Sequence, residues 1–246
     1  MQEKSIKENR AGRRSVKQWI ALGLVIIGIP AVLLLSWQMG DRKYYLTSML
    51  VLLCAVAAFW LSFERRRPKT REMVLIAVMC AIAVASRVAF IMFPQFKPIV
   101  GIVMICGMSL GSQAGFMTGS ISAFVSNFIF GQGAWTPWQM FAFGLAGLLA
   151  GYLCRAGVMT SGKRLVTALI GGGMILVLIG PILDTCTLFT MSSVINTEAV
   201  GSVYLSGLPF NAVHGAAVFL TLLILARPMI EKLDRIKVKY GLMEAE

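Results

Sequence analysis

The chain alternates between long apolar runs and short polar breaks. Eight runs have the composition of helices that cross a membrane. A helix needs about 20 apolar residues to span the hydrocarbon core of a bilayer. The stretch 98–130 is too long for one crossing, so we expect two short helices that turn near Gly111–Gln113. The expected spans are Trp19–Trp37, Tyr44–Phe63, Met73–Phe93, Pro98–Leu110, Ala114–Phe130, Pro137–Leu153, Leu165–Leu183 and Leu208–Ala226.

Composition agrees with this pattern. Apolar residues make up 57% of the 246 residues and charged residues only 14%, with a mean hydropathy of +0.77. A soluble domain carries about 25% charged residues, so the low charged fraction of this chain excludes a soluble globular protein. The sequence therefore predicts an all-α integral membrane protein.

The net charge of +12 is distributed unevenly over the breaks. If both termini are cytoplasmic, 19 basic residues lie inside, three lie outside, and Arg87 lies within a span. The positive-inside rule therefore predicts a multi-pass protein of the cell (plasma) membrane with cytoplasmic ends. This distribution also removes nucleic acid as an expected partner.

A basic break at 64–71 (ERRRPKTR) divides the chain. Residues 1–70 are expected to form a basic arm and two accessory transmembrane helices, residues 71–232 a six-helix core, and residues 233–246 a cytoplasmic tail. The polar segment Asp184–Gly207 is expected to be a long outer loop, either disordered or a lid over a site.

The sequence contains none of the common enzyme motifs. It has one histidine and no zinc-protease motif, P-loop or nucleophile elbow. We therefore expect no enzyme activity, no cofactor and no metal site, and any ATP-driven role would need a separate ATPase chain.

Polar residues accumulate near the outer ends of the expected core helices. Arg87 lies about 9 Å below the outer end of the third expected span. A cation at this depth faces protein, water or a ligand. Alternatively, its side chain reaches the lipid headgroups or pairs with Asp184. Together these residues could line an outward pocket. Alternatively, Thr136 and Gln139 form a helix capping box, Trp135 and Trp138 lie at the membrane–water interface, and Asn127 and His214 form hydrogen bonds between helices. The candidate substrate-binding residues are Arg87, Lys97, Asn127, Gln132, Trp135, Thr136, Trp138, Gln139, Asp184, Tyr204, Asn211 and His214.

Small residues recur at intervals of four along several expected helices. Ala77, Ala81 and Ala85 share one helix face near the cytoplasmic boundary, where a partner subunit could approach closely. Glycines with the same spacing are expected to pack the core helices against one another. They are Gly107, Gly111, Gly115, Gly119, Gly147 and Gly151.

Residues 71–232 resemble the substrate-binding S component of an energy-coupling factor (ECF) vitamin transporter. The resemblance is carried by six helices, the Ala77/Ala81 step, and the stretches Phe96–Gly111, Ser122–Asn127 and 131–140 (GQGAWTPWQM). It is greatest for S components assigned to cobalamin. The resemblance implies that the chain captures a vitamin outside and docks through Ala77 and Ala81 on a transmembrane coupling subunit. Two separate ATP-binding subunits would then drive release inside.

Several alternatives stay open at this point. The substrate could be cobalamin, queuosine, pyridoxine or pantothenate. The chain could also be a self-sufficient secondary transporter, although it shows no internal repeat and no evident ion-coupling carboxylate. In a third hypothesis it is a non-transport membrane scaffold, and the outer polar groups only tie helices together.

Overall fold

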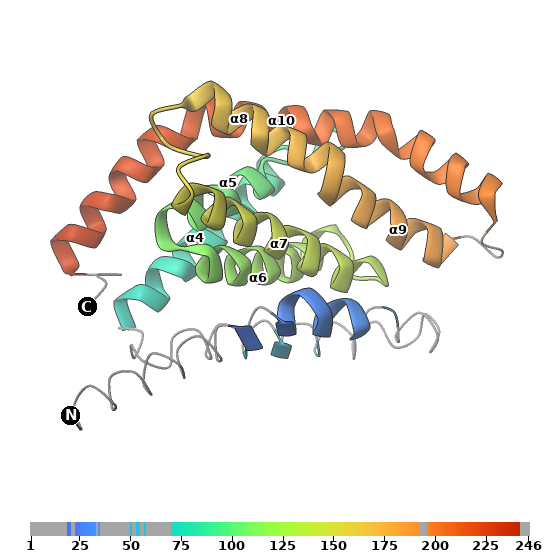
Figure 1. Cartoon of the computed structure of the whole chain (residues 1–246), viewed down its shortest axis with the longest axis horizontal. Coiled ribbons are helices and arrows are strands. Elements are labelled where there is room, and N and C mark those ends of the chain that lie inside the picture. The colour runs from blue at the N-terminus through green and yellow to red at the C-terminus, as the bar shows by residue number, and fades with distance from the viewer. Residues whose placement is uncertain are drawn as a thin grey trace, which may run out of the picture.

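The computed structural model describes residues 19–20, 23–32, 34, 50, 53–54, 57, 70–191 and 196–241 (Figure 1). These residues form helices and no strand, which confirms the all-helical prediction. The basic arm, most of the expected span Tyr44–Phe63 and most of the break 64–71 lie outside the described residues. In the first expected span, Leu24–Gly28 forms the π-helical segment η1, and Val25 and Ile29 are buried.

Seven α-helices follow along the described chain. α8, the π-helical segment η3 and α9 run on without a break as one helix, Arg164–Met191. Four helices in the described part are long and apolar enough to cross a membrane: α4, α7, the joined α8–α9, and α10. The bounds are α4 Thr70–Ala89, α5 Ile99–Leu110, α6 Ser112–Phe130, α7 Trp135–Arg155, α8 Arg164–Met174, η3 Ile175–Ile179, α9 Gly180–Met191 and α10 Thr197–Tyr240.

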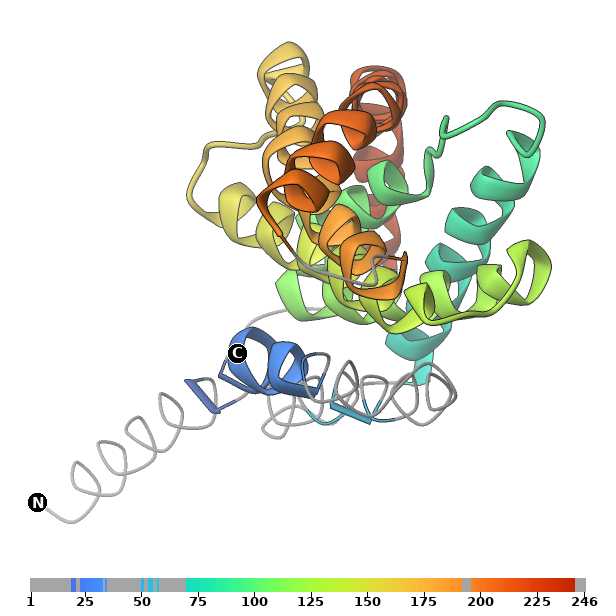
Figure 2. The same cartoon turned by 90° about the vertical axis from the view of Figure 1, so that its right-hand side faces the viewer.

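The centre of the core is the contact between α5, α6 and α7 (Figures 1 and 2). A Cβ added to Gly107 or Gly115 would overlap the backbone of Gly147, and one added to Gly119 would overlap the backbone of Phe143. Every residue of α5 is buried, although this helix is only about 18 Å long. The predicted glycine packing is therefore confirmed for Gly107, Gly115, Gly119, Gly147 and Gly151, whereas Gly111 makes no such contact. The predicted turn is also present, because Gly111 separates α5 from α6 with a φ of 99°.

The expected long outer loop at Asp184–Gly207 is wrong. α9 continues to Met191, and α10 begins at Thr197. Within α9, the hydroxyls of Thr185, Thr187 and Thr190 each donate to the backbone carbonyl four residues earlier, so this polar segment satisfies its hydrogen bonds as a helix. Asn196 then caps α10 by accepting from the backbone N–H of Ala199 at 2.8 Å.

The two ends of the molecule differ in charge. At one end, Arg71 lies 5.4 Å from the ring of Tyr240, and Lys237 donates to the carbonyl of Ser109 at 2.8 Å. Further basic residues lie where α7 ends and α8 begins: Arg155, Lys163 and Arg164. The α6–α7 connection, the end of α9 and the start of α10 lie at the opposite end (Figure 1). The fold thus separates a basic end from an end that carries few basic residues.

Candidate functional site

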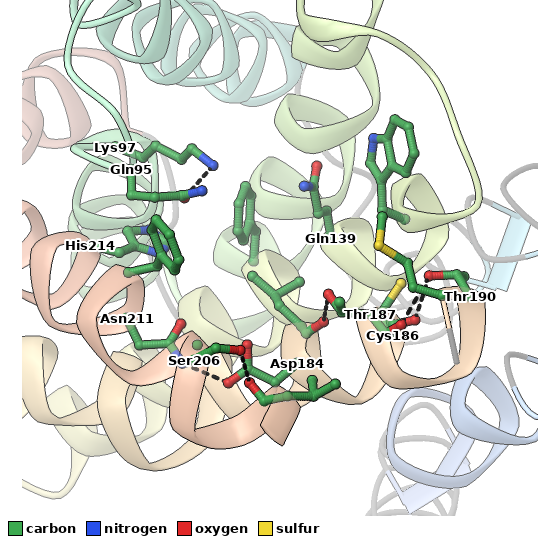
Figure 3. Close-up of a pocket in the computed structure, with 17 residues that line it drawn as sticks. Gln95, Lys97, Gln139, Asp184, Cys186, Thr187, Thr190, Ser206, Asn211 and His214 are labelled. Carbon is green, nitrogen blue, oxygen red and sulfur yellow. Dashed lines mark hydrogen bonds between the residues drawn. The ribbon is translucent and has the colours of Figure 1, made fainter. Parts of the chain in front are cut away.

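A cavity of about 310 Å³ opens at the less basic end, between the α4–α5 connection, α7, α9 and α10 (Figure 3). This is a size at which a pocket can hold a small organic ligand. Of the twelve residues predicted to bind substrate, six line the cavity: Lys97, Trp135, Gln139, Asp184, Asn211 and His214. The residues that complete the lining are Gln95, Phe143, Leu183, Cys186, Thr187, Thr190, Met191, Val203, Ser206, Gly207 and Phe210.

Lys97 supplies a positive charge to this lining from the α4–α5 connection. Its ammonium donates to Oε1 of Gln95 at 2.7 Å, and in the described part of the chain it pairs with no carboxylate. Burial, together with the nearby positive charge of Arg87, lowers the pKa of Lys97 to about 8. The rings of Phe90 and Phe96, with centroids 5.0 Å apart, hold this connection in place.

Asp184 supplies a negative charge from α9. Its Oδ2 accepts from Nδ2 of Asn211 on α10 at 2.7 Å. The pair depends on two glycines, because a Cβ on Gly207 would lie 2.5 Å from Oδ1 of Asp184, and a Cβ on Gly180 would lie 2.5 Å from the amide carbon of Asn211. Beside this pair, the hydroxyl of Tyr204 lies 2.7 Å from that of Thr185 and joins the same two helices.

His214 lies one turn after Asn211 and lines the same cavity. Its side chain is buried, and its Nε2 has no hydrogen-bond partner among the described residues. The ring packs edge-on against Phe143, with centroids 6.2 Å apart. A buried imidazole nitrogen without a partner costs free energy, so it is a natural contact for a bound ligand.

Arg87 does not line the cavity. It is only 5% exposed, and its Nη1 donates to Oγ of Ser126 and, at 2.9 Å, to Oδ1 of Asn127. Its guanidinium lies 4.3 Å from the ring of Phe130. The pair between Arg87 and Asp184 is not formed, because Arg87 donates to Ser126 and Asn127, and Asp184 accepts from Asn211.

Asn127 extends this contact into a buried network that we call the polar knot. Its Nδ2 donates to Oγ1 of Thr136 at 3.0 Å and to Oε1 of Gln139 at 2.9 Å. The hydroxyl of Thr136 in turn donates to Oε1 of Gln132 at 2.9 Å. The polar knot comprises Arg87, Ser126, Asn127, Gln132, Thr136 and Gln139.

Thr136 and Gln139 belong to the polar knot and do not form the capping box that is the alternative interpretation of the sequence. Ala134, not Thr136, is the N-cap of α7, and it makes no side-chain cap bond. Thr136 lies inside the first turn, where its hydroxyl accepts from the backbone N–H of Gly133 at 3.2 Å. Gln139 bonds to Asn127 and also lines the cavity, so it belongs to both the knot and the site.

The two tryptophans of the GQGAWTPWQM stretch have different surroundings. Trp138 is buried, and its ring packs edge-on against Phe189 of α9 with centroids 5.8 Å apart. Trp135 is exposed, lines the cavity, and donates through Nε1 to the carbonyl of Gly131 at 3.3 Å. Trp138 therefore joins helices, whereas Trp135 is available to a ligand.

Sequence reasoning missed the hydroxyl side of the cavity. Thr187, Thr190 and Ser206 lie in the segment Asp184–Gly207, and an expected loop predicts no common helix face for these side chains. The signal that could have found them is the density of hydroxyl residues in this segment. Among the described residues, no cluster of three His, Cys, Asp or Glu side chains could hold a metal ion.

A second hollow is an apolar groove between α4 and α6. Ala77, Ala81 and Ala85 line it and are exposed, as expected for residues that share one helix face. The α6 side of the groove consists of Met117, Ile121, Val125 and Ile129.

Comparison with known proteins identifies the family of the chain. The sequence profile of the family described as "ECF-type riboflavin transporter, S component" matches residues 67–232, which is more than half of the chain. Neither the curated proteins nor the solved structures include a significant match. The matched region contains the cavity, the polar knot and the apolar groove. The chain therefore belongs to the family of ECF-type riboflavin transporter S components.

Proposed function

We propose that this chain is the membrane-embedded substrate-binding subunit of an ECF importer and that it captures riboflavin or a micronutrient of similar size. The observation that carries the proposal is the cavity of about 310 Å³ within the matched region, at the end of the molecule that carries few basic residues. Cobalamin is several times larger than a flavin, and the family description names riboflavin. Both facts favour a flavin-sized substrate over cobalamin.

The cavity lining suits a flat, polar-edged ring system. Phe143, Phe210 and Leu183 supply apolar walls, and Trp135 supplies an exposed aromatic face. Polar groups on the same lining would fix the orientation of the ring, as in most small-molecule sites. Binding therefore needs no catalytic group, and we propose no enzymatic step.

The proposed topology follows from the charge distribution. Under the positive-inside rule the basic end faces the cytoplasm, so both termini lie inside and the cavity opens outward. If the joined α8–α9 is counted once, the region from α4 to α10 is a six-helix core. We propose that the expected spans Trp19–Trp37 and Tyr44–Phe63 add two transmembrane helices before this core.

Release requires a partner, because the chain has no nucleotide-binding motif. We propose that the apolar groove docks on the transmembrane coupling subunit, since the small side chains of Ala77, Ala81 and Ala85 let a second helix approach closely. Two separate ATP-binding subunits would supply the energy for inward release.

A binding measurement tests the proposal most directly. The purified protein in detergent should quench riboflavin fluorescence on titration and bind it at submicromolar concentration. A protein that instead copurifies with a corrinoid, visible in its absorption spectrum, would restore cobalamin as the substrate. If no vitamin in a panel binds or raises the thermal stability, the substrate-binding function is wrong, and the scaffold hypothesis gains support.

The docking surface is tested by paired substitutions on α4. Ala77→Trp with Ala81→Trp should abolish uptake in cells while leaving riboflavin binding intact, because the tryptophans fill the groove. The matched control is Val74→Trp with Val78→Trp, since both valines are exposed on α4 but do not line the groove. Normal uptake by the alanine variant would instead indicate a carrier that works without a partner.

A further inference from the structure

The cavity carries one positive and one negative group that do not neutralise each other. Lys97 bonds to Gln95, and Asp184 bonds to Asn211. The ion pairs in the described part of the chain, Arg227–Glu231 and Lys237–Asp234, lie in the C-terminal part of α10, far along the chain from this site. Figure 3 shows Lys97, Gln95 and His214 on one side of the cavity and Asp184 and Ser206 on another.

The Lys97 side lacks a negative counterpart. A partly buried ammonium without a carboxylate costs free energy, and the second cation, Arg87, raises this cost. The lowered pKa of Lys97, about 8, reflects both effects. A ligand group that accepts hydrogen bonds would relieve this cost, and the free Nε2 of His214, which donates in the tautomer that carries its proton there, lies on the same side of the cavity.

The Asp184 side of the cavity favours ligand groups that donate hydrogen bonds. An ionised carboxylate only accepts hydrogen bonds. Asn211 uses Oδ2, while Oδ1 packs against Gly207 at a position where only a residue without a side chain fits, and Asp184 lines the cavity. A hydroxyl or amine of a ligand can donate to this oxygen, whereas a ligand carboxylate or carbonyl would be repelled.

We propose that the cavity orients its substrate by charge, so that an acceptor-rich group lies against Lys97 and His214 and hydroxyl or amine donors lie against Asp184. The inference rests on the proposed function and names its substrate class: a molecule with acceptor oxygens at one end and donors at the other. A flavin meets this description with the dione of its ring toward Lys97 and its ribityl hydroxyls toward Asp184.

The test compares riboflavin with lumiflavin, which keeps the ring but has a methyl group in place of the ribityl chain. Asp184→Asn should weaken riboflavin binding about tenfold and leave lumiflavin binding unchanged, because only riboflavin carries the hydroxyls. Lys97→Met should weaken both ligands at least tenfold. Lys97→Arg keeps the charge and is the matched control, and thermal unfolding of each variant establishes that it is folded.

Two results would overturn the orientation. One is an equal loss of both ligands in Asp184→Asn, and the other is a loss confined to riboflavin in Lys97→Met. If neither flavin binds the wild type, the flavin assignment fails separately. The inference is then decided with pantothenate and its alcohol panthenol, because wild type should prefer the carboxylate and Lys97→Met should not. Equal affinity for the two, or no binding of either, would refute it.

Discussion

The polar knot and the cavity are built from similar residues but differ in how those residues are satisfied. In the knot, Asn127 bonds to three different side chains, and Arg87 has two acceptors. In the cavity, Nε2 of His214 has no partner in the described part of the chain, and Lys97 faces no carboxylate. Apart from Nε of Arg87, which has no partner among the described residues, the side chains of the knot thus bond to one another, whereas the cavity leaves polar groups available to a ligand.

This difference shows where the most distinctive sequence segment acts. The GQGAWTPWQM stretch contributes Gln132, Thr136 and Gln139 to the knot, but only Trp135 and Gln139 to the cavity lining. A dense polar motif in a membrane protein can therefore mark a junction between helices as much as a binding site. The knot should govern stability, and the cavity should govern affinity.

The largest expected effect follows from breaking the knot. Asn127→Ala removes three hydrogen bonds and leaves the buried Arg87 with fewer acceptors, so we expect a loss of about 3 kcal/mol in the free energy of unfolding. Denaturant unfolding in detergent micelles measures it. Ser109→Ala is the control, because this buried hydroxyl has no partner among the described residues and its loss should be nearly neutral. Equal effects of the two variants would show that the knot adds no stability.

A smaller effect is expected from adding a side chain at Gly207, next to Asp184. Gly207→Ala places a Cβ against the carboxylate, which must move, so riboflavin affinity should fall about tenfold. Gly201→Ala, on the same helix, meets no atom within 4 Å and should raise stability by about 0.5–1 kcal/mol. Fluorescence titration and thermal unfolding of both variants separate the two roles. Unchanged affinity in Gly207→Ala would mean that Asp184 takes no part in binding.

Much of the helical core could be predicted from the sequence, since long apolar runs and glycines spaced by four are properties of single helices. The bend at Gly111 and the packing of Gly107 against Gly147 follow from such local patterns. The helical state of Asp184–Met191 could not be predicted, because its threonine hydroxyls satisfy carbonyls within a helix as readily as they would in a loop.

The candidate site was only half accessible to sequence reasoning. Convergence of polar residues at one end was sufficient to choose Lys97, Gln139, Asp184, Asn211 and His214. It could not separate residues that bond to one another, such as Arg87 and Asn127, from residues left open. That distinction depends on side-chain partners across helices far apart in the chain.

The smallest expected effect is a pH dependence that should appear in the cavity alone. Lys97 has a pKa of about 8 in the folded protein against 10.5 ordinarily. The charged fraction of Lys97 therefore falls about fourfold between pH 7 and 8.5, and riboflavin affinity should fall by about the same factor if binding needs the ammonium.

The stability of the unliganded protein should change in the opposite direction. Between pH 8 and 10.5 the unfolded chain binds more protons than the folded chain, so Lys97 contributes increasing stability as the pH rises through this window. Lys97→Met should remove both trends, whereas Ser109→Ala should keep both. A wild-type affinity that is constant from pH 7 to 8.5 would exclude the Lys97 ammonium from binding.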